Sequence, residues 1–343
     1  MSTKSAPPEV VIAYVQLGIN PSPTLMEFAK HARKYFPRAS CILITDNPSL
    51  WTAFPGEVVQ YRRHDLHEDL RNILSGFPEY AEIAGGYWMF TLERIFALGV
   101  LSKTYPKSMP VLHFESDVLS FISPEIFNVL RQNISKTSFP RFNETKGIGS
   151  ILFTPSLEQM ESDLNRLSAL LGDTTQWQSD MEVLGLALRK EFAEELPTYP
   201  ADALPYHGEQ FIFDGAAIGQ YLFGVDPLHT DGKIVSGFQN ENYNVDLRSA
   251  HWEITNSLTD GLPRISCELD GKKVTLLNLH VHSKIVLKSI SESNEVWSRY
   301  ILEANSEISR REFYVEVPVI HSAPISFRNR IRILKRRFKN FYN

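Results

Sequence analysis

Two carboxylates separated by one residue, Glu115 and Asp117, lie within the segment PVLHFESDVLSF. In an extended chain, side chains two residues apart point to the same side, so both carboxylates would face one direction while Ser116 faces the other. Paired oxygens of this kind suit a hard divalent ion such as Mg²⁺ or Mn²⁺, which completes its coordination with water and substrate phosphates. A solvated turn has the same composition, so the spacing alone leaves both interpretations open.

A second segment with chemical potential is NLHVHSK, residues 278–284. The same alternation would place His280, His282 and Lys284 on one face of a strand. An imidazole nitrogen could complete a manganese site, and a lysine ammonium could neutralise a diphosphate leaving group. The alternative is a strand with a hydrated polar face, in which imidazole serves only in hydrogen bonding. The spacing does not rank the two histidines.

Two further carboxylates lie where helices are predicted to begin. Asp214 precedes GAAIGQYLF, whose small residues permit close packing, and Asp180 precedes MEVLGLAL. Each can cap its helix by accepting hydrogen bonds from backbone N–H groups. Each can also act as a general base toward a hydroxyl group, with Asp214 the first candidate and Asp180 the second. Arg94, in a predicted helix before the acidic strand, either contacts a nucleotide or pairs with a nearby acid.

The elements that must position these residues begin with a strand, a helix and a second strand. Residues 10–17 (VVIAYVQL) and 41–45 (CILIT) are short apolar runs typical of buried strands. Between them, apolar residues in 25–36 repeat at helical spacing, with Thr24 as the expected cap and Pro37 marking the end. This order is a βαβ unit, which predicts a parallel sheet with a right-handed crossover.

The remaining pattern also alternates between helices and strands. Helices are predicted at 87–101, 157–171, 180–192 and 214–223, a strand at 111–121, and strands at 265–269 and 273–278 around the hairpin turn Asp270-Gly271. Ligands of open α/β sheets bind beyond the carboxyl ends of strands, so acids at the end of a strand indicate a site. The predicted fold class is α/β, with a mixed, mostly parallel sheet flanked by helices and a late β-hairpin.

Length and composition are those of an ordinary folded protein. The 343 residues are 43% hydrophobic and 22% charged, which argues against a mostly disordered or low-complexity chain. Cys41 and Cys267 are far apart and lack CxxC spacing, so they support neither a disulfide framework nor a zinc ribbon. The sequence shows no apolar leader and no long apolar run, so we expect a cytoplasmic protein without signal peptide or membrane span.

The last eighteen residues, 326–343, are a basic segment. They hold seven Lys and Arg residues and no acid, and because the whole chain has a net charge of −5, the rest carries −12. So acidic a body is poorly suited to binding nucleic acid. Apolar residues of the tail fall on one face of a helix, which predicts reversible binding to an anionic membrane surface. Docking on the protein's own acidic surface or on a partner, and an RNA-binding arm, are the alternatives.

Taken together, these segments resemble the metal-dependent glycosyltransferases of the GT-A fold. The likeness lies in the strand ending in acid-x-acid, the helix YWMFTLERIFAL before it, the segment FDGAAIGQYLFGVDP and the late His/Lys segment. The resemblance implies that Glu115 and Asp117 occupy the DxD positions that hold metal and nucleotide diphosphate, with Asp117 the more direct ligand. It also implies that His280 or His282 is the late metal histidine and that Lys284 faces the diphosphate.

The sequence departs from this family at two points. The first acid is Glu115 rather than aspartate, and HVHSK is shorter than the HFxGxxKPW pattern of glycogenin-like enzymes and lacks its glycine and tryptophan. Whether the anomeric configuration is retained or inverted therefore stays open. An inverting enzyme would need a general base such as Asp214 or Asp180, whereas a retaining enzyme would not.

The predicted function is transfer of a sugar from a nucleotide-diphosphate donor, a UDP-sugar first among these, to a glycan or lipid-linked acceptor, with Mn²⁺ or Mg²⁺ as cofactor. One catalytic domain is expected over 8–322, with a nucleotide-sugar half at 8–125 and an acceptor half at 126–322, followed by the tail at 323–343. The alternatives are a non-catalytic scaffold of the same fold and a metal-dependent nucleotidyltransferase or phosphohydrolase.

Overall fold

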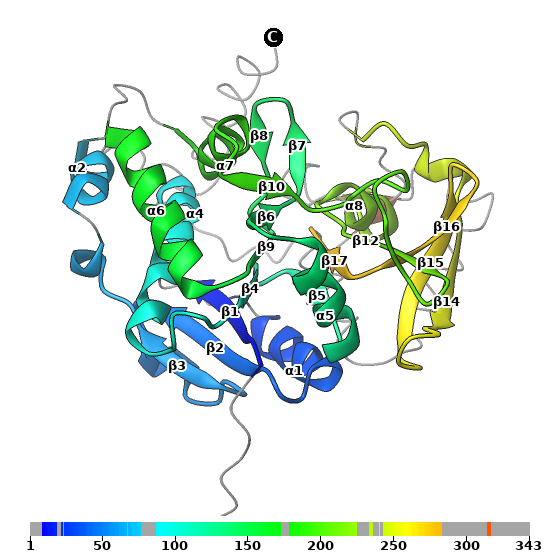
Figure 1. Cartoon of the computed structure of the whole chain (residues 1–343), viewed down its shortest axis with the longest axis horizontal. Helices are drawn as coiled ribbons and strands as arrows, with labels where there is room; N and C mark the ends of the chain where they lie inside the picture. Colours follow the sequence, from blue (N-terminus) through cyan, green and yellow to red (C-terminus); the bar gives the residue numbers. More distant parts are fainter. Residues whose placement is uncertain are drawn as a thin grey trace, which may run out of the picture.

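The protein is described by a computed structural model that covers residues 9–18, 22, 24–66, 68–76, 87–172, 178–224, 233–235, 240, 243–282 and 314–316. Its central element is a seven-stranded sheet with the strand order β10-β6-β9-β4-β1-β2-β3 (Figure 1). The strands are β1 (Val11–Gln16), β2 (Ser40–Thr45), β3 (Glu57–Gln60), β4 (Val111–Phe114), β6 (Thr137–Phe139), β9 (Ile151–Thr154) and β10 (Ala193–Glu195).

The sheet is mostly parallel. β1 pairs in parallel with β2 and β4, β2 pairs in parallel with β3, and β6 pairs in parallel with β10. β9 is antiparallel to both of its neighbours, β4 and β6. The helix α1 (Leu25–Tyr35) connects β1 to β2, so the predicted βαβ unit and the predicted fold class are confirmed.

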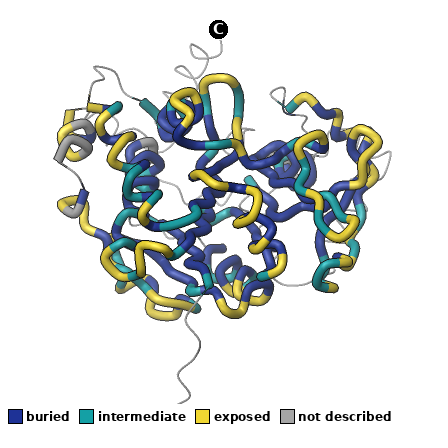
Figure 2. Tube along the Cα trace, in the orientation of Figure 1, coloured by how far each residue is buried: buried dark blue, intermediate teal, exposed yellow. Residues whose placement is uncertain are grey.

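Helices cover both faces of this sheet. They are α2 (Glu68–Gly76), α4 (Tyr87–Ala97), α5 (Pro124–Asn133), α6 (Leu157–Gly172) and α7 (Asp180–Arg189), in addition to α1. Alternate residues of β1 enter two different cores because successive side chains of a strand point to opposite faces. Val11, Ala13 and Val15 pack with α2, α4, α6 and α7, whereas Ile12 and Tyr14 pack with α1 and α5. Figure 2 shows buried segments gathered in the interior of the molecule, with exposed segments mainly at its periphery.

A second, five-stranded sheet lies beside the first, at the right of Figure 1. Its order is β11-β12-β16-β15-β14, with β11 (Leu204–Tyr206), β12 (Glu209–Ile212), β14 (His251–Asn256), β15 (Pro263–Leu269) and β16 (Lys272–Leu276). The short helix α8 (Ala217–Phe223) packs on its apolar face. The predicted hairpin is confirmed: Asp270 and Gly271 have φ angles of 49° and 70°, as a two-residue β15–β16 turn requires.

Short strand pairs connect these parts. β5 (Val118–Ser120) pairs antiparallel with β17 (Asn278–His280), which brings the end of the central sheet to the end of the second sheet. β7 (Arg141–Asn143) pairs with β8 (Lys146–Gly147), and β13 (Lys233–Val235) pairs with β18 (Tyr314–Glu316). One-turn or two-turn 3₁₀ helices occupy Pro48–Trp51, Arg63–Asp65, Leu98–Lys103 and Leu247–Ser249.

Several local expectations need correction. The strand predicted at 111–121 is two strands, β4 and β5, separated by a turn. Thr24 precedes α1 without capping it, and its hydroxyl instead donates to the carbonyl of Ser116 at 3.2 Å. Within the described part of the chain, no helix is long and apolar enough to cross a bilayer. Lys284 and the basic tail lie outside the described residues, and the division at residue 125 stays a prediction.

Candidate metal centre

The acidic pair lies in a tight turn at the carboxyl end of β4. The N–H of Val118 donates to the carbonyl of Glu115 at 3.1 Å, which closes the turn, and the N–H of Glu115 donates to the carbonyl of Ser150 at 2.9 Å. The expectation that Glu115 and Asp117 share one face of an extended strand was therefore wrong. The turn nevertheless directs both carboxylates toward the same histidine, His280.

His280 reaches the turn because β17 pairs with β5. Val118 and His280 are opposite each other in this antiparallel pair, and the N–H of Val281 donates to the carbonyl of Asp117 at 2.9 Å. Nδ1 of His280 lies 2.7 Å from the carbonyl oxygen of Gly215, which can only accept, so Nδ1 carries a hydrogen. The other ring nitrogen, Nε2, consequently faces the two carboxylates.

The three side chains form one compact cluster. Nε2 of His280 is 3.6 Å from an oxygen of Glu115 and 3.6 Å from an oxygen of Asp117. One ligand atom from each residue lies within 4.8 Å of the other two, although the histidine is about 160 residues further along the chain. This cluster is the candidate metal centre.

Electrostatics at the cluster favour positive charge. Burial by itself lowers the pKa of His280, but the charge of Asp117, a hydrogen bond to it and the charge of Glu115 together raise that pKa to about 9. Burial raises the pKa of Glu115, since the carboxylate is removed from water, and the guanidinium of Arg94 acts against this. A proton on Nε2 and a divalent cation are the two ways to supply the charge this position attracts.

Arg94 on α4 is the main partner of the acidic side of the centre. Its guanidinium donates to Glu115 and lies 3.8 Å from a carboxylate oxygen of Asp180, the first residue of α7. Asp180 is 6% exposed, and burial raises its pKa while Arg94 opposes the rise. The N-cap of α7 is Ser179 in a complete capping box, so Asp180 is not the N-cap residue. Two carboxylates, those of Glu115 and Asp180, thus meet one guanidinium.

Asp214 is positioned differently. It is 1% exposed, and its carboxylate accepts hydrogen bonds from the backbone N–H groups of Ile218, Gly219 and His280 at 2.8–3.0 Å. Burial raises its pKa, and these backbone N–H groups oppose the rise. Because all three bonds hold backbone in place, the geometry favours a structural role in which Asp214 fixes α8 against β17.

Of the two other predicted residues in the segment 278–284, His282 is described by the structure and Lys284 is not. The ring of His282 lies against that of His280, with 4.1 Å between their centroids, and its Nε2 is 3.4 Å from the amide nitrogen of Gln220. His280, not His282, therefore belongs to the three-residue cluster. Lys284 lies outside the described residues, so its predicted role at a diphosphate stays a prediction.

Two positioning residues escape detection from the sequence. Asn278 is fully buried; its side-chain oxygen accepts from the N–H of Asp214 at 3.0 Å and its amide donates to the Asp214 carbonyl at 2.8 Å. Gly219 lets α8 approach β17, because a Cβ there would lie 1.9 Å from the carbonyl oxygen of His280. The small residues after Asp214 are the signal for this close packing, whereas nothing in the local pattern identifies the partner of Asn278.

A second buried carboxylate lies next to Arg94 in sequence. Glu93 is 1% exposed and accepts hydrogen bonds from the hydroxyl of Tyr61 and from Nε of Arg63, both at 2.8 Å. Both partners follow β3, at the carboxyl end of the parallel strands, where open α/β sheets bind ligands. At the same edge, Asp46 after β2 accepts from the N–H of Gly18 at 3.1 Å. The local sequence pattern does not mark these residues as part of a site.

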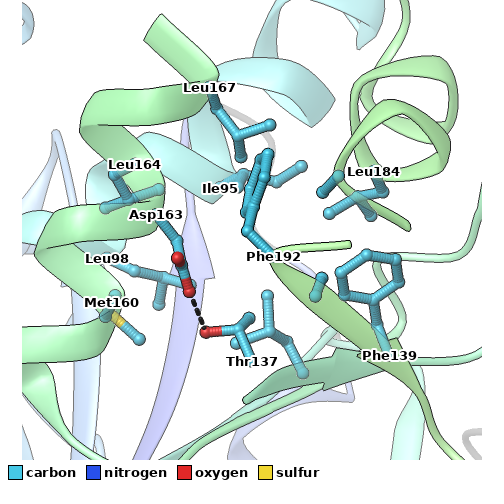
Figure 3. A pocket seen from close by; sticks show the side chains of 13 residues that line it. Ile95, Leu98, Thr137, Phe139, Met160, Asp163, Leu164, Leu167, Leu184 and Phe192 are labelled. Atoms are coloured by element: carbon cyan, nitrogen blue, oxygen red, sulfur yellow. Dashed lines mark hydrogen bonds between the residues drawn. The ribbon is translucent and has the colours of Figure 1, made fainter. Parts of the chain in front are cut away.

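An apolar cavity, lined by none of the three metal-centre residues, lies between α6, α7 and the sheet (Figure 3). Leu98, Leu167 and Phe192 are among its walls. The carboxylate of Asp163 already accepts from the hydroxyl of Thr137 at 2.6 Å and from the amide of Gln159. This cavity is a packing gap in the core and offers no polar group to a ligand.

No protein-family model and no curated protein matches the sequence. Solved structures that are similar include the apo form of the glycosyltransferase GlyE of Streptococcus pneumoniae, at 11% identity and a TM-score of 0.36 over 54% of this chain and 44% of that chain. Mouse xyloside xylosyltransferase 1 is 9% identical, with a TM-score of 0.34 over 55% of this chain and 85% of that chain. Core-mannan synthase A of Aspergillus fumigatus, in an Mn/GDP form, is 9% identical, with a TM-score of 0.37 over 61% and 77%.

These similar structures are glycosyltransferases, the class that the sequence resembles. This chain spans less than half the length of GlyE, with 44% of that chain covered. All three TM-scores are below 0.5, so the similarity assigns no activity to the chain. A functional proposal must depend on the geometry of the site.

Proposed function

We propose that the protein is a metal-dependent glycosyltransferase that uses a nucleotide-sugar donor. The observation that carries the proposal is the convergence of Glu115, Asp117 and His280 at the carboxyl end of β4 in a mostly parallel sheet. Metal-binding carboxylates at that edge are suited to a nucleotide diphosphate, because Mg²⁺ and Mn²⁺ bridge a few protein ligands to phosphate oxygens.

The ligand set fits Mn²⁺ or Mg²⁺. Carboxylate oxygens suit both ions, and one imidazole nitrogen is better tolerated by Mn²⁺. The Gly215 carbonyl fixes the orientation of the His280 ring, as second-shell groups do for metal-bound histidines. Three protein ligands leave coordination positions for water and substrate oxygens. When bound, the ion would stabilise the negative charge that develops on the diphosphate leaving group.

The protein's own residues have separable roles in this proposal. Arg94 holds Glu115 through one carboxylate oxygen and leaves the other facing His280. Asp180, 3.8 Å from the Arg94 guanidinium, is proposed to accept a hydrogen bond from a sugar hydroxyl or to act as general base. Asp214 is the weaker candidate for the base because three backbone N–H groups already occupy its oxygens.

The donor nucleotide is proposed to bind along the carboxyl ends of β1, β2 and β3. Asp46 and the pair of Glu93 with Arg63 lie at this edge, and a nucleoside offers ribose hydroxyls and base edges to such groups. UDP-sugars remain the first expected donors, and Lys284 remains a predicted contact of the diphosphate. A glycan or lipid-linked acceptor, and binding of the basic tail 326–343 to an anionic membrane surface, likewise stay proposals.

A donor panel tests this function. Purified protein with Mn²⁺ and a set of UDP-, GDP- and TDP-sugars should release the nucleoside diphosphate from at least one donor, and chelation should abolish the release. Asp117→Asn should lower the rate by about 1,000-fold, since a lost metal ligand removes several kcal/mol of transition-state stabilisation. The matched control is Asp246→Asn, an exposed aspartate on the second-sheet side, which should keep the wild-type rate.

Product analysis separates the alternatives. A nucleotidyltransferase would release pyrophosphate and a phosphohydrolase would release inorganic phosphate, in place of a nucleoside diphosphate. A protein that binds no donor, and whose cellular role survives Asp117→Asn, would be a scaffold. Any of these three results would overturn the proposed function.

A further inference from the structure

An open hollow lies beside the metal centre, over the backbone of residues 214–218. We name it the Tyr199 pocket; the side chains that the argument uses are Arg141, Phe142, Thr198, Tyr199, Asn240 and Tyr243. They come from the β7–β8 hairpin, the segment after β10 and the segment before β14. The pocket is therefore formed by parts of the chain that flank the second sheet.

The Tyr199 pocket and the metal centre share a wall. Gly215 lines the pocket, and its carbonyl oxygen accepts the hydrogen bond from Nδ1 of His280 at 2.7 Å. Ile148 also lines the pocket, while the next residue, Gly149, faces the carboxylates of Glu115 and Asp180 at 3.9 Å from its ideal Cβ position. A molecule bound in the pocket would thus be separated from the metal centre only by the wall that contains Gly215 and the adjacent residues Ile148 and Gly149.

The side chains of the pocket combine flat apolar surfaces with neutral hydrogen-bonding groups. Tyr199 and Tyr243 stack with 4.9 Å between ring centroids and 13° between their planes, and the Tyr243 hydroxyl donates to the Thr198 carbonyl at 2.9 Å. This bond fixes the stacked pair, and Phe142 adds a further aromatic wall. Aromatic surface with a few placed polar groups suits a ring that has an apolar face and hydroxyls at its edge.

The charges around the pocket are balanced. Nε of Arg141 donates to the carboxylate of Glu195 at 2.6 Å, so its charge is compensated. The carboxylate of Asp214 is occupied by backbone N–H groups and is 1% exposed. Thr198, Asn240 and the tyrosines are neutral. Among the lining residues that the structure describes, no uncompensated cation is present to attract a phosphate.

We propose that the Tyr199 pocket is the acceptor subsite and that it binds a neutral pyranose. This inference rests on the proposed function, because the word acceptor has meaning only if a sugar is transferred at the metal centre. The charge balance favours a neutral sugar over a phosphorylated or lipid-phosphate group. The acceptor is therefore a glycan whose terminal residue is uncharged.

Saturation-transfer NMR on the full chain tests the subsite. The probes are methyl pyranosides of glucose, galactose, mannose and xylose, with glycerol phosphate as the anionic probe. At least one methyl pyranoside should show saturation transfer, and Tyr199→Ala should raise its Kd about tenfold, because an aromatic contact of this kind contributes roughly one power of ten in affinity. Phe142→Ala, on an exposed hairpin, should act in the same direction and provides a second variant if Tyr199→Ala does not fold.

The matched control is Tyr206→Ala, a half-buried tyrosine of β11 that does not line the pocket and should leave the Kd unchanged. No transfer to any pyranoside, preference for glycerol phosphate, or a Kd insensitive to both pocket variants would overturn the inference. Donor turnover measured in parallel separates the two proposals. Turnover without pyranoside binding would reject the pocket alone. Pyranoside binding that Tyr199→Ala weakens, without any donor turnover, would reject the proposed function and the acceptor role and would leave only a pyranose-binding pocket.

Discussion

Two arginines of this molecule are largely buried among acids, and their surroundings differ. Arg264 is fully buried; it forms a two-pronged pair with Asp260, donates twice to the carbonyl of Phe121 and lies over the ring of Tyr35. Arg94 is 17% exposed and lies between Glu115 and Asp180. The first arginine has one acid and a complete set of partners, whereas the second meets an excess of acids.

Charge balance and accessibility distinguish the structural ion pair of Arg264 from the candidate site at Arg94. The Arg264 cluster joins the second sheet to β5 and α1 with its charges balanced, so it has no use for an added ion. The Arg94 cluster has two carboxylates, those of Glu115 and Asp180, for one guanidinium and is partly accessible at the carboxyl end of a sheet. An excess of negative charge at an accessible, structurally fixed position indicates a binding site.

The largest stability effect is expected at the structural pair. Arg264→Met leaves the Asp260 carboxylate, 8% exposed, without its partner and should lower the free energy of unfolding by about 3–5 kcal/mol. Urea unfolding measures this loss, and added Mn²⁺ should not reverse it. Arg248→Met, at an exposed arginine, is the control and should unfold like the wild type. A loss below about 1 kcal/mol would contradict the structural assignment of Arg264.

At Arg94, the main effect should be on activity. Arg94→Met removes the charge that holds Glu115 and Asp180, and turnover should fall about 100-fold, equivalent to about 2.7 kcal/mol in activation free energy. The variant should also lose stability, and Mn²⁺ should restore part of that loss by supplying positive charge. Equal effects of Mn²⁺ on the thermal unfolding of Arg94→Met and Arg264→Met would show that the two clusters do not differ as described.

The surroundings of Arg264 should also make the free energy of unfolding sensitive to acid. Burial lowers the pKa of His31, which stacks on Tyr35 beside Arg264, to about 4. In the unfolded chain His31 binds a proton near pH 6.5, whereas in the folded chain it does so only near pH 4. The free energy of unfolding therefore falls as the pH decreases from about 6.5 to about 4. Between pH 7.5 and 4.5, His31→Gln should remove about 2 kcal/mol of the wild-type loss in unfolding free energy. An unchanged pH dependence would contradict the lowered pKa of His31.

The smallest expected effect is at Gly149, which faces the carboxylates of Glu115 and Asp180. A Cβ there would make only ordinary contacts, the nearest at 3.5 Å from Leu184, so Gly149→Ala should change stability by less than about 0.5 kcal/mol. The added methyl group would still narrow the space beside the metal centre, and turnover should fall a few-fold. Gly219→Ala gives the contrast, because its Cβ would lie 1.9 Å from the His280 carbonyl and should disrupt the fold.

Much of the architecture could be predicted because it is encoded locally. The period of apolar residues predicts α1, α4 and the strands β1 and β2, and Asp270-Gly271 predicts the hairpin. The two stretches bearing Glu115, Asp117 and His280 were also expected to meet, and the structure brings them together.

The details of the site could not be predicted, since they depend on contacts between distant segments. The turn at Glu115 lies between β4, which belongs to the central sheet, and β5, which pairs with β17 instead. No local pattern in the sequence specifies this change of pairing partner. Asn278 holds Asp214, and Gly215 holds His280, through hydrogen bonds between residues that are 64 and 65 positions apart in the sequence. From the sequence Asp214 is predicted as a general base or a helix cap, and only the three N–H groups on its oxygens favour the structural role.

The most direct test of the central claim is a crystal structure of the protein soaked with Mn²⁺ and UDP, with anomalous scattering measured at the manganese edge. Metal binding by Glu115, Asp117 and His280 predicts one strong anomalous peak in contact with these three side chains and with oxygens of the diphosphate. Nucleotide bound with no manganese between these three side chains, or manganese bound elsewhere on the molecule, would contradict it.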